Sequence, residues 1–303
     1  MNFTAKDVQA LREKTGCGMM DCKKALVESD GDVEKAIEIL REKGLAAVAK
    51  KSGRIAAEGI VTAYTDEAAK VSVVLEVNAE TDFVAKNDVF KGFVADVAKT
   101  VADKNPADVD ALMECTMDNG NTVATELQEK IYTIGENIKI RRFVRYEGVV
   151  ATYIHGAGRI GVMVKYETSD DVANAPAFKE AARDVAMQIA AINPLYLDKD
   201  SVPEAELETE KRILTQQVMD EGKPANIAEK IVAGKMAKFF KENCLMDQVF
   251  VKDGDFTVSS YLAKIAKELG GEIKTVSYVR FEKGEGLQKK EDNFAEEVAN
   301  MVK

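Results

Sequence analysis

The chain has little of the chemistry from which most catalytic and metal centres are built. Its 303 residues include one histidine, His155, and four cysteines, Cys17, Cys22, Cys115 and Cys244. The cysteine spacing matches no zinc pattern, and a single histidine is a weak basis for any other metal site. Disulfides are not expected, because reduced thiols in a cytosolic protein are the simpler interpretation.

Long apolar runs and an excess of positive charge are also missing. No segment is long enough to span a membrane, and the first residues resemble neither a signal peptide nor a transit peptide. We therefore expect a cytoplasmic protein. Charged residues make up 31% of the chain, yet the net charge is −10. An acidic chain lacks the basic face that nonspecific nucleic-acid binding needs, so we expect protein partners.

The sequence also contains few candidates for a phosphate-binding loop. There is no Walker loop, and residues 156–161 form the only Gly-x-Gly-x-x-Gly. A dinucleotide site needs a helix after such a loop, but an apolar strand, residues 162–166, follows here. We interpret the loop as a hairpin turn and expect neither direct nucleotide binding nor a cofactor.

No catalytic centre can be assembled from the remaining side chains. His155 lies at the hairpin without a serine or cysteine nucleophile placed by any motif, so a triad is unsupported. It is either an exposed turn residue or a hydrogen-bonding contact with a partner. A hydrolase would need a constellation that the chain lacks, and we expect a protein that is not an enzyme.

The spacing of apolar residues divides the chain into several parts. Residues 1–43 predict a three-helix unit, and residues 44–57 a linker with helical tendency. The body then repeats itself. Segments 58–61 and 147–150 match, as do segments 143–147 and 278–282. Each copy is predicted as strand, hairpin, strand, helices and strand, which indicates an α+β subdomain with a small antiparallel sheet and helices on one face.

The two copies, residues 58–147 and 148–282, differ by an insertion in the second. Two apolar stripes separated by a turn at Gly222 predict an antiparallel helical hairpin, an arm at about residues 203–243. Residues 283–303 predict a C-terminal module, in which a glycine-containing stretch precedes an amphipathic helix.

One strand-to-helix corner stands out. The apolar strand at residues 71–77 leads into Thr81, Asp82, Phe83 and Val84, which we call the corner. Phe83 either folds back onto the core or is offered to a partner as an anchor. The matching residues of the second copy, 169–172, keep acids but have no phenylalanine. A large ring in one copy alone favours a function specific to the first copy.

Two long stretches resemble the bacterial translation elongation factor Ts family. They are residues 11–26, LREKTGCGMMDCKKAL, and residues 76–87, EVNAETDFVAKN. Shorter segments at 222–224, 229–232 and 248–252 are similar as well, so that the resemblance covers essentially the whole chain. The chain departs from the family at Cys17, where alanine is common.

The resemblance implies a guanine nucleotide exchange factor for elongation factor Tu, with an N-terminal domain like the ubiquitin-associated fold. It implies that the corner disturbs the partner's Mg²⁺ site, so that GDP leaves and GTP can bind. Further partner contacts are implied at Arg12, Thr15, Gly16, Met19, Met20, Ile134, Gly135, Glu136, Asn137 and His155. The alternative is a protein-binding adaptor without exchange activity, and self-association through the arm is a further option.

Overall fold

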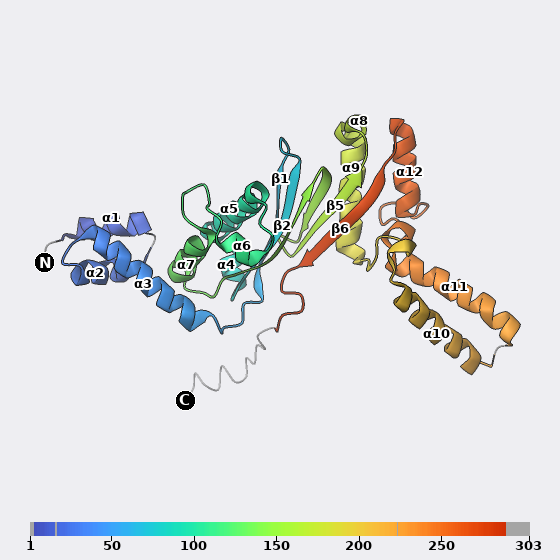
Figure 1. Cartoon of the computed structure of the whole chain (residues 1–303), viewed down its shortest axis with the longest axis horizontal. Helices are drawn as coiled ribbons and strands as arrows, with labels where there is room; N and C mark the ends of the chain where they lie inside the picture. The colour runs from blue at the N-terminus through green and yellow to red at the C-terminus, as the bar shows by residue number, and fades with distance from the viewer. Residues whose placement is uncertain (1–2, 16, 223, 289–303) are drawn as a thin grey trace.

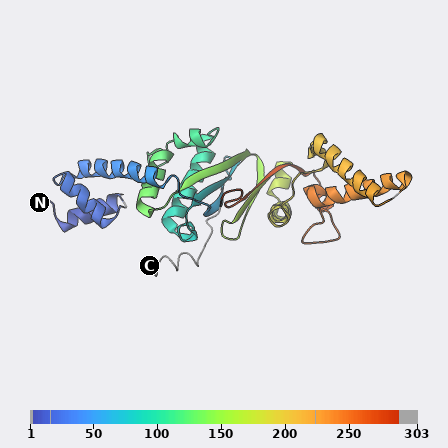
Figure 2. The same ribbon diagram turned by 90° about the horizontal axis from the view of Figure 1, so that it is seen from below.

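The computed structural model describes residues 3–15, 17–222 and 224–288. These residues form an elongated molecule with three parts in line (Figure 1). N-terminal helices lie at one end, two small sheets with their helices lie in the middle, and a helical hairpin lies at the other end. The view from below shows the same order (Figure 2).

Three helices make the N-terminal unit: α1 (Ala5–Thr15), α2 (Met19–Glu28) and α3 (Val33–Lys51). Leu11, Leu26 and Leu40 lie at its core. The α3 helix passes through residue 43, so the predicted linker is helical as far as Lys51. Gly44 does not stop the helix; it lies where α3 approaches α7, and a Cβ there would be 3.8 Å from the Cβ of Tyr132.

The two predicted copies are present in the same order. The first contains β1 (Glu58–Asp66), β2 (Val71–Ala79), α4 (Asp82–Lys86), α5 (Asp88–Lys104), α6 (Val109–Met113), α7 (Val123–Ile134) and β3 (Lys139–Glu147). The second contains β4 (Val149–His155), β5 (Ile160–Glu167), α8 (Asp170–Asn174), α9 (Pro176–Ile192), α12 (Val258–Leu269) and β6 (Lys274–Glu282). Each forms a three-stranded antiparallel sheet, β1-β2-β3 and β4-β5-β6. The α+β prediction is confirmed.

The two sheets pack against each other, with helices on their outer faces (Figure 1). This explains why every residue of β2 is buried. Alternate residues such as Val73 and Leu75 belong to the core with Phe90 of α5, whereas Val74 packs across the sheet interface against Met163. The sheet face that a single copy would expose to water is therefore an interior surface.

The insertion in the second copy is the predicted arm. Its helices are α10 (Glu204–Asp220) and α11 (Ala225–Asn243), flanked by the short 3₁₀ helices η1 (Lys199–Ser201) and η2 (Leu245–Asp247). Val218 and Val232 lie in the core of the hairpin. Two backbone N–H groups, of Leu195 and Tyr196, donate to the Asn243 carbonyl at 2.9 and 3.1 Å and fix the base of the arm.

The Gly-x-Gly-x-x-Gly stretch, residues 156–161, lies in the β4–β5 hairpin. Gly156 and Gly158 have φ values of 59° and 92°, which suit a tight turn. No helix within the described ranges is long and apolar enough to cross a membrane. The C-terminal helix predicted within residues 283–303 falls mostly on 289–303, outside the described residues, whereas 283–287 form a turn after β6.

Candidate site for a protein partner

The corner joins β2 to the single turn of α4. Thr81 caps this turn, because its hydroxyl accepts a hydrogen bond from the Val84 backbone N–H at 3.5 Å. Val84 is buried in the core of the first copy, whereas Phe83 is 79% exposed. Val84 anchors the turn to the core, and the side chain of the neighbouring Phe83 is exposed to water. The ring therefore points outward, although its contact with a partner stays a prediction.

A carboxylate from the segment after α7 supports the corner. Glu136 accepts hydrogen bonds from the backbone N–H groups of Glu80 and Thr81 at 3.1 and 3.0 Å. The Thr81 hydroxyl donates to the same carboxylate at 2.6 Å. In return, the Asn137 backbone N–H donates to the Glu80 side chain at 2.6 Å. Hydrogen bonds therefore join the corner to residues 134–137, which the sequence predicts as a separate contact region.

This arrangement changes the expected roles of two residues. Asn137 is only 3% exposed, and its amide donates to the Arg54 carbonyl at 2.7 Å. Its burial argues against the direct partner contact predicted for it, and Glu136 is likewise engaged with the corner. Both residues hold the corner in place in this structure, and a contact of the half-buried Glu136 with a partner stays a prediction. Gly135 is exposed and ends α7 with a φ of 88°, which turns the chain back toward β3.

Asp82 begins α4 and carries its charge in water. Its carboxylate lies 2.6 Å from the Lys86 ammonium, and Lys86 also lies 5.8 Å from the centre of the Phe83 ring. The hydrogen bond from Lys86 lowers the pKa of Asp82 below its usual value, so the carboxylate is ionised at neutral pH. Ion pairs exposed to water in this way contribute little to stability, because solvent screens them. Asp82 can therefore exchange Lys86 for groups on a partner at little cost.

A groove of about 650 Å³ runs between the corner and the N-terminal helices, and we call it the corner groove. It brings together three of the predicted regions: Thr15 from α1, Phe83 and Val84 from the corner, and Ile134 from the end of α7. Its other lining residues are Lys14, Asn87, Val89, Asn119, Glu126, Glu129, Lys130 and Thr133.

The remaining predicted N-terminal contacts lie on the surface. Arg12 is exposed, and Met19 and Met20 at the start of α2 are 42% and 60% exposed. Two neighbouring methionines in water suit an adaptable protein contact, because the side chain is flexible and polarizable. Gly16 lies outside the described residues.

His155 does not line the corner groove. It is exposed at the end of β4, where its Nδ1 lies 3.0 Å from the Tyr153 hydroxyl. The hairpin that follows it docks on β1, since the Val61 N–H donates to the Gly158 carbonyl at 2.8 Å. Val61 pairs with Glu76. His155 therefore belongs to a hairpin that lies beside the half of β2 leading to the corner.

The corner of the second copy shows which features belong to the repeated unit. Ser169 caps α8 as Thr81 caps α4, and Val172 is buried as Val84 is. Asp171 takes the place of Phe83 and is exposed. Both copies thus point this position outward, and only the first places a large apolar ring there.

Two residues of the site were not nominated from the sequence. Glu80 binds the Asn137 backbone N–H and also lies 3.4 Å from Arg54. Lys86 pairs with Asp82 at the i,i+4 spacing, which is a signal that the sequence contained. The role of Glu80 depends on a segment more than fifty residues away, so local pattern could not have identified it.

Comparison with known proteins decides the family. A family model described as elongation factor TS matches residues 80–285. The chain belongs to the elongation factor Ts family. It is 52% identical to elongation factor Ts of Clostridium perfringens (strain SM101 / Type A) over 302 residues, and 53% identical to that of Clostridium kluyveri (strain NBRC 12016) over 305 residues. Each comparison covers 99% of both chains.

Membership of the elongation factor Ts family implies the role of a nucleotide exchange factor for elongation factor Tu in translation. Such a factor changes the affinity of its partner for a nucleotide and does not catalyse a chemical reaction. The family assignment confirms the resemblance that was recognised in residues 11–26 and 76–87.

Glu136 is expected to support the corner during exchange. Replacing Glu136 by alanine removes its hydrogen bonds to Glu80 and Thr81, so the corner must be ordered during binding. We expect the stimulated release of GDP from elongation factor Tu to fall about tenfold, the effect of about 1.4 kcal/mol of ordering cost. Fluorescent GDP release measures this. Glu67→Ala, in the exposed β1–β2 turn, is the control. A wild-type rate for Glu136→Ala would show that the corner needs no such support.

Proposed function

We propose that the chain binds the GDP complex of elongation factor Tu, disturbs the Mg²⁺ site with its corner, and promotes GDP release so that GTP can bind. The observation that carries this proposal is the 79% exposure of Phe83 on a turn that Thr81, Val84 and Glu136 hold in place. An exposed aromatic ring on a supported turn, beside an ionised carboxylate at the surface, is suited to entering a pocket on a partner.

The thermodynamic requirement is simple. An exchange factor binds the nucleotide-free partner more tightly than the GDP-bound partner, and linkage requires that it weaken GDP binding by the same factor. GTPases hold the nucleotide with a phosphate-binding loop and Mg²⁺. Phe83 supplies apolar anchoring between helices of the GTPase domain. Asp82 displaces groups that position the metal, without needing to bind the metal itself.

The other predicted contacts would add to the contact made by the corner. We propose that the corner groove receives a helix of the GTPase domain, between Thr15 on one side and Ile134 on the other. Arg12, Met19 and Met20 extend this contact, and His155 adds a hydrogen bond from the second copy. The protein would act in the cytoplasm as an N-terminal unit, two core subdomains, an arm and a C-terminal module. Self-association through the arm stays a prediction, which sedimentation of the purified chain checks.

The release of GDP from purified elongation factor Tu, measured with and without this chain, tests the proposed function. Acceleration at sub-stoichiometric concentrations of the chain supports exchange activity. Binding without acceleration would leave the adaptor alternative, in which the three-helix unit and the body only hold a partner.

A further inference from the structure

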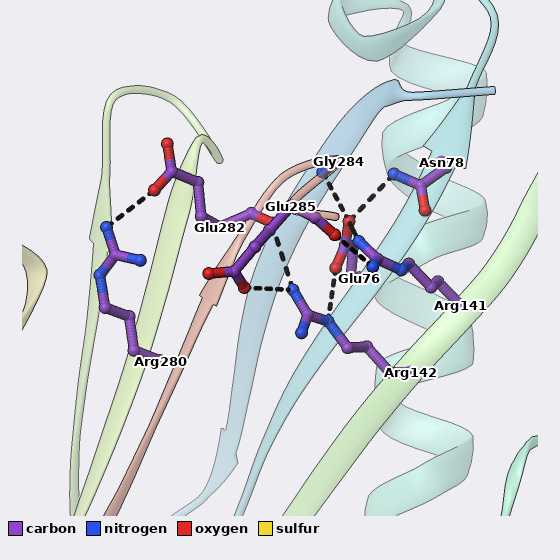
Figure 3. A network of polar contacts seen from close by, with 8 residues as sticks. All are labelled: Glu76, Asn78, Arg141, Arg142, Arg280, Glu282, Gly284 and Glu285. Atoms are coloured by element: carbon purple, nitrogen blue, oxygen red, sulfur yellow. Dashed lines mark hydrogen bonds and ion pairs between the residues drawn. The ribbon is translucent and has the colours of Figure 1, made fainter. Parts of the chain in front are cut away.

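A buried carboxylate, Glu76, lies between the two sheets, where the proposed function makes no use of it (Figure 3). It is fully buried and is the one charged side chain in a strand that otherwise contains apolar residues, serine and asparagine. It belongs to the face of β2 that packs against the second sheet. Glu76 accepts hydrogen bonds from Arg142 Nε at 2.6 Å, Arg141 Nη1 at 3.0 Å and Asn78 at 3.0 Å.

A β-bulge delivers both arginines to this carboxylate. In the β2–β3 ladder Glu76 pairs with Arg142 and Val77 pairs with Ile140, so Arg141 is an extra residue. In a regular strand, adjacent side chains point to opposite faces, but a bulge re-aims one of them. Arg141 and Arg142 therefore reach the same carboxylate from neighbouring positions.

The second copy keeps the bulge but has neither the carboxylate nor the two arginines. There Lys165 pairs with Ser277 and Tyr166 pairs with Thr275, so Val276 is the extra residue. Lys165 corresponds to Glu76, and neither Ser277 nor Val276 carries a charge. The bulge therefore belongs to the repeated unit, whereas the carboxylate with two guanidinium groups belongs to the first copy alone.

Further contacts of the cluster go to the turn at residues 283–287, which we call the C-terminal turn. The Gly284 backbone N–H donates to Glu76 at 2.8 Å. Arg142 lies 3.2 Å from the Glu285 carboxylate, and Arg141 donates to the Glu285 carbonyl. One buried carboxylate thus connects the first sheet to the segment that leaves the second sheet.

The C-terminal turn is held tightly against β1. Gly284 has a φ of 69°, and a Cβ there would lie 2.2 Å from the Ala57 carbonyl oxygen, so only glycine fits. Lys283 pairs with Glu58, and its backbone N–H donates to the Arg159 carbonyl at 2.8 Å. The turn also lies near the corner, because Glu58, the partner of Lys283, pairs with Ala79 in the β1–β2 ladder, two residues before Thr81. After the hydrogen bond from Lys86, the charge of Lys283 contributes to lowering the pKa of Asp82.

We propose that Glu76 is a positioning residue for nucleotide exchange, which fastens the C-terminal turn beside the corner so that both meet elongation factor Tu as one surface. This inference rests on the proposed function. Glu76 touches neither the partner nor the nucleotide; it acts through Gly284 and the two arginines. Without Glu76 the corner keeps its shape, because Glu136 and Val84 hold it independently of Glu76. The C-terminal turn, however, is no longer held beside the corner.

The test compares Glu76→Gln with wild type in titrations of GDP release from elongation factor Tu. We expect the concentration for half-maximal stimulation to rise at least about tenfold, because two linked contacts become one. The maximal rate should stay within about a factor of two, since the corner is intact. Lys165→Gln, at the equivalent position of the second copy, should change neither quantity.

Hydrogen exchange separates positioning from general support of the fold. In Glu76→Gln the peptide over residues 282–288 should exchange faster, while peptides over α5 and α9 keep their protection. If Glu76→Gln folds but exchanges faster throughout the chain, the proposal is overturned in favour of a purely structural role. A fall in the maximal rate at unchanged half-maximal concentration would overturn it too, because Glu76 would then act on the corner.

A second variant keeps the proposal testable if Glu76→Gln does not fold. Gly284→Ala displaces the C-terminal turn by the clash with Ala57 but leaves the Glu76 ion pairs in place, and it should raise the half-maximal concentration by a similar factor. Where both variants fold, the double variant should have a half-maximal concentration no higher than that of either single variant. If the two increases multiplied, Glu76 and Gly284 would act independently, which would contradict the proposal. If wild type itself fails to stimulate release, the proposed function fails, and not this inference alone.

Discussion

Replacing Asp82 and Phe83 together by alanine is expected to slow stimulated GDP release at least about a hundredfold, because burial of a phenylalanine alone contributes about 2–3 kcal/mol. Phe83 is 79% exposed in the free chain, so its apolar surface is available to a partner. Asp82 would add the displacement of groups around the metal. The measurement is stopped-flow release of fluorescent GDP from elongation factor Tu.

The fold should not change in this variant. Asp82 has only an exposed pair with Lys86, and Phe83 makes little contact with the core, so the free energy of unfolding should change by less than about 0.5 kcal/mol. Leu195→Ala is a matched control, because Leu195 is 63% exposed and lies in the second copy, away from the corner. If the double variant released GDP as fast as wild type, the role given to the corner would be wrong.

Replacing Gly161 by valine is expected to destabilise the fold by about 3 kcal/mol, at the upper end of the cost of overpacking a core. A Cβ at Gly161 would lie 2.4 Å from Val61 Cγ1 and 3.0 Å from Val74 Cγ2, both across the interface between the sheets. The two sheets would have to separate locally to admit the side chain. Urea unfolding followed by circular dichroism measures the loss.

Gly92→Val is the control for this substitution. A Cβ at Gly92, in the interior of α5, would meet no heavy atom within 4 Å apart from its chain neighbours and the nearby backbone of its own helix, so valine should be tolerated and leave stability within about 0.5 kcal/mol. Equal stability of the Gly161 and Gly92 variants would contradict the close packing of the two sheets. It would also remove the reason for a glycine at the end of the Gly-x-Gly-x-x-Gly stretch.

Local pattern predicts the elements of this fold well, for a physical reason. Each copy alternates strands and helices with apolar residues at regular spacing, and the matching segments 143–147 and 278–282 occupy equivalent places in β3 and β6. The outward direction of Phe83 was also foreseeable, because the second copy has Asp171 at that place. These inferences depend only on neighbours in sequence or on comparing the two copies.

What escaped prediction depends on contacts between distant segments. Nothing local indicates that the sheets pack face to face, although Glu76 inside an apolar strand was a hint that this face meets charged groups. The support of the corner by Glu136 joins residues more than fifty positions apart. The sequence predicts a partner contact at Asn137, but this residue is buried and its amide donates to the Arg54 carbonyl, a contact that no pattern indicates.

The role of Mg²⁺ is the centre of the proposed mechanism, and one comparison tests it directly. GDP release from elongation factor Tu is measured with wild type and with the Asp82→Ala, Phe83→Ala variant, first with Mg²⁺ and then after its removal by a chelator. If the corner acts by disturbing the metal, the advantage of wild type should fall from at least about a hundredfold to less than about tenfold once the metal is gone. An advantage of the same size without Mg²⁺ would contradict the account.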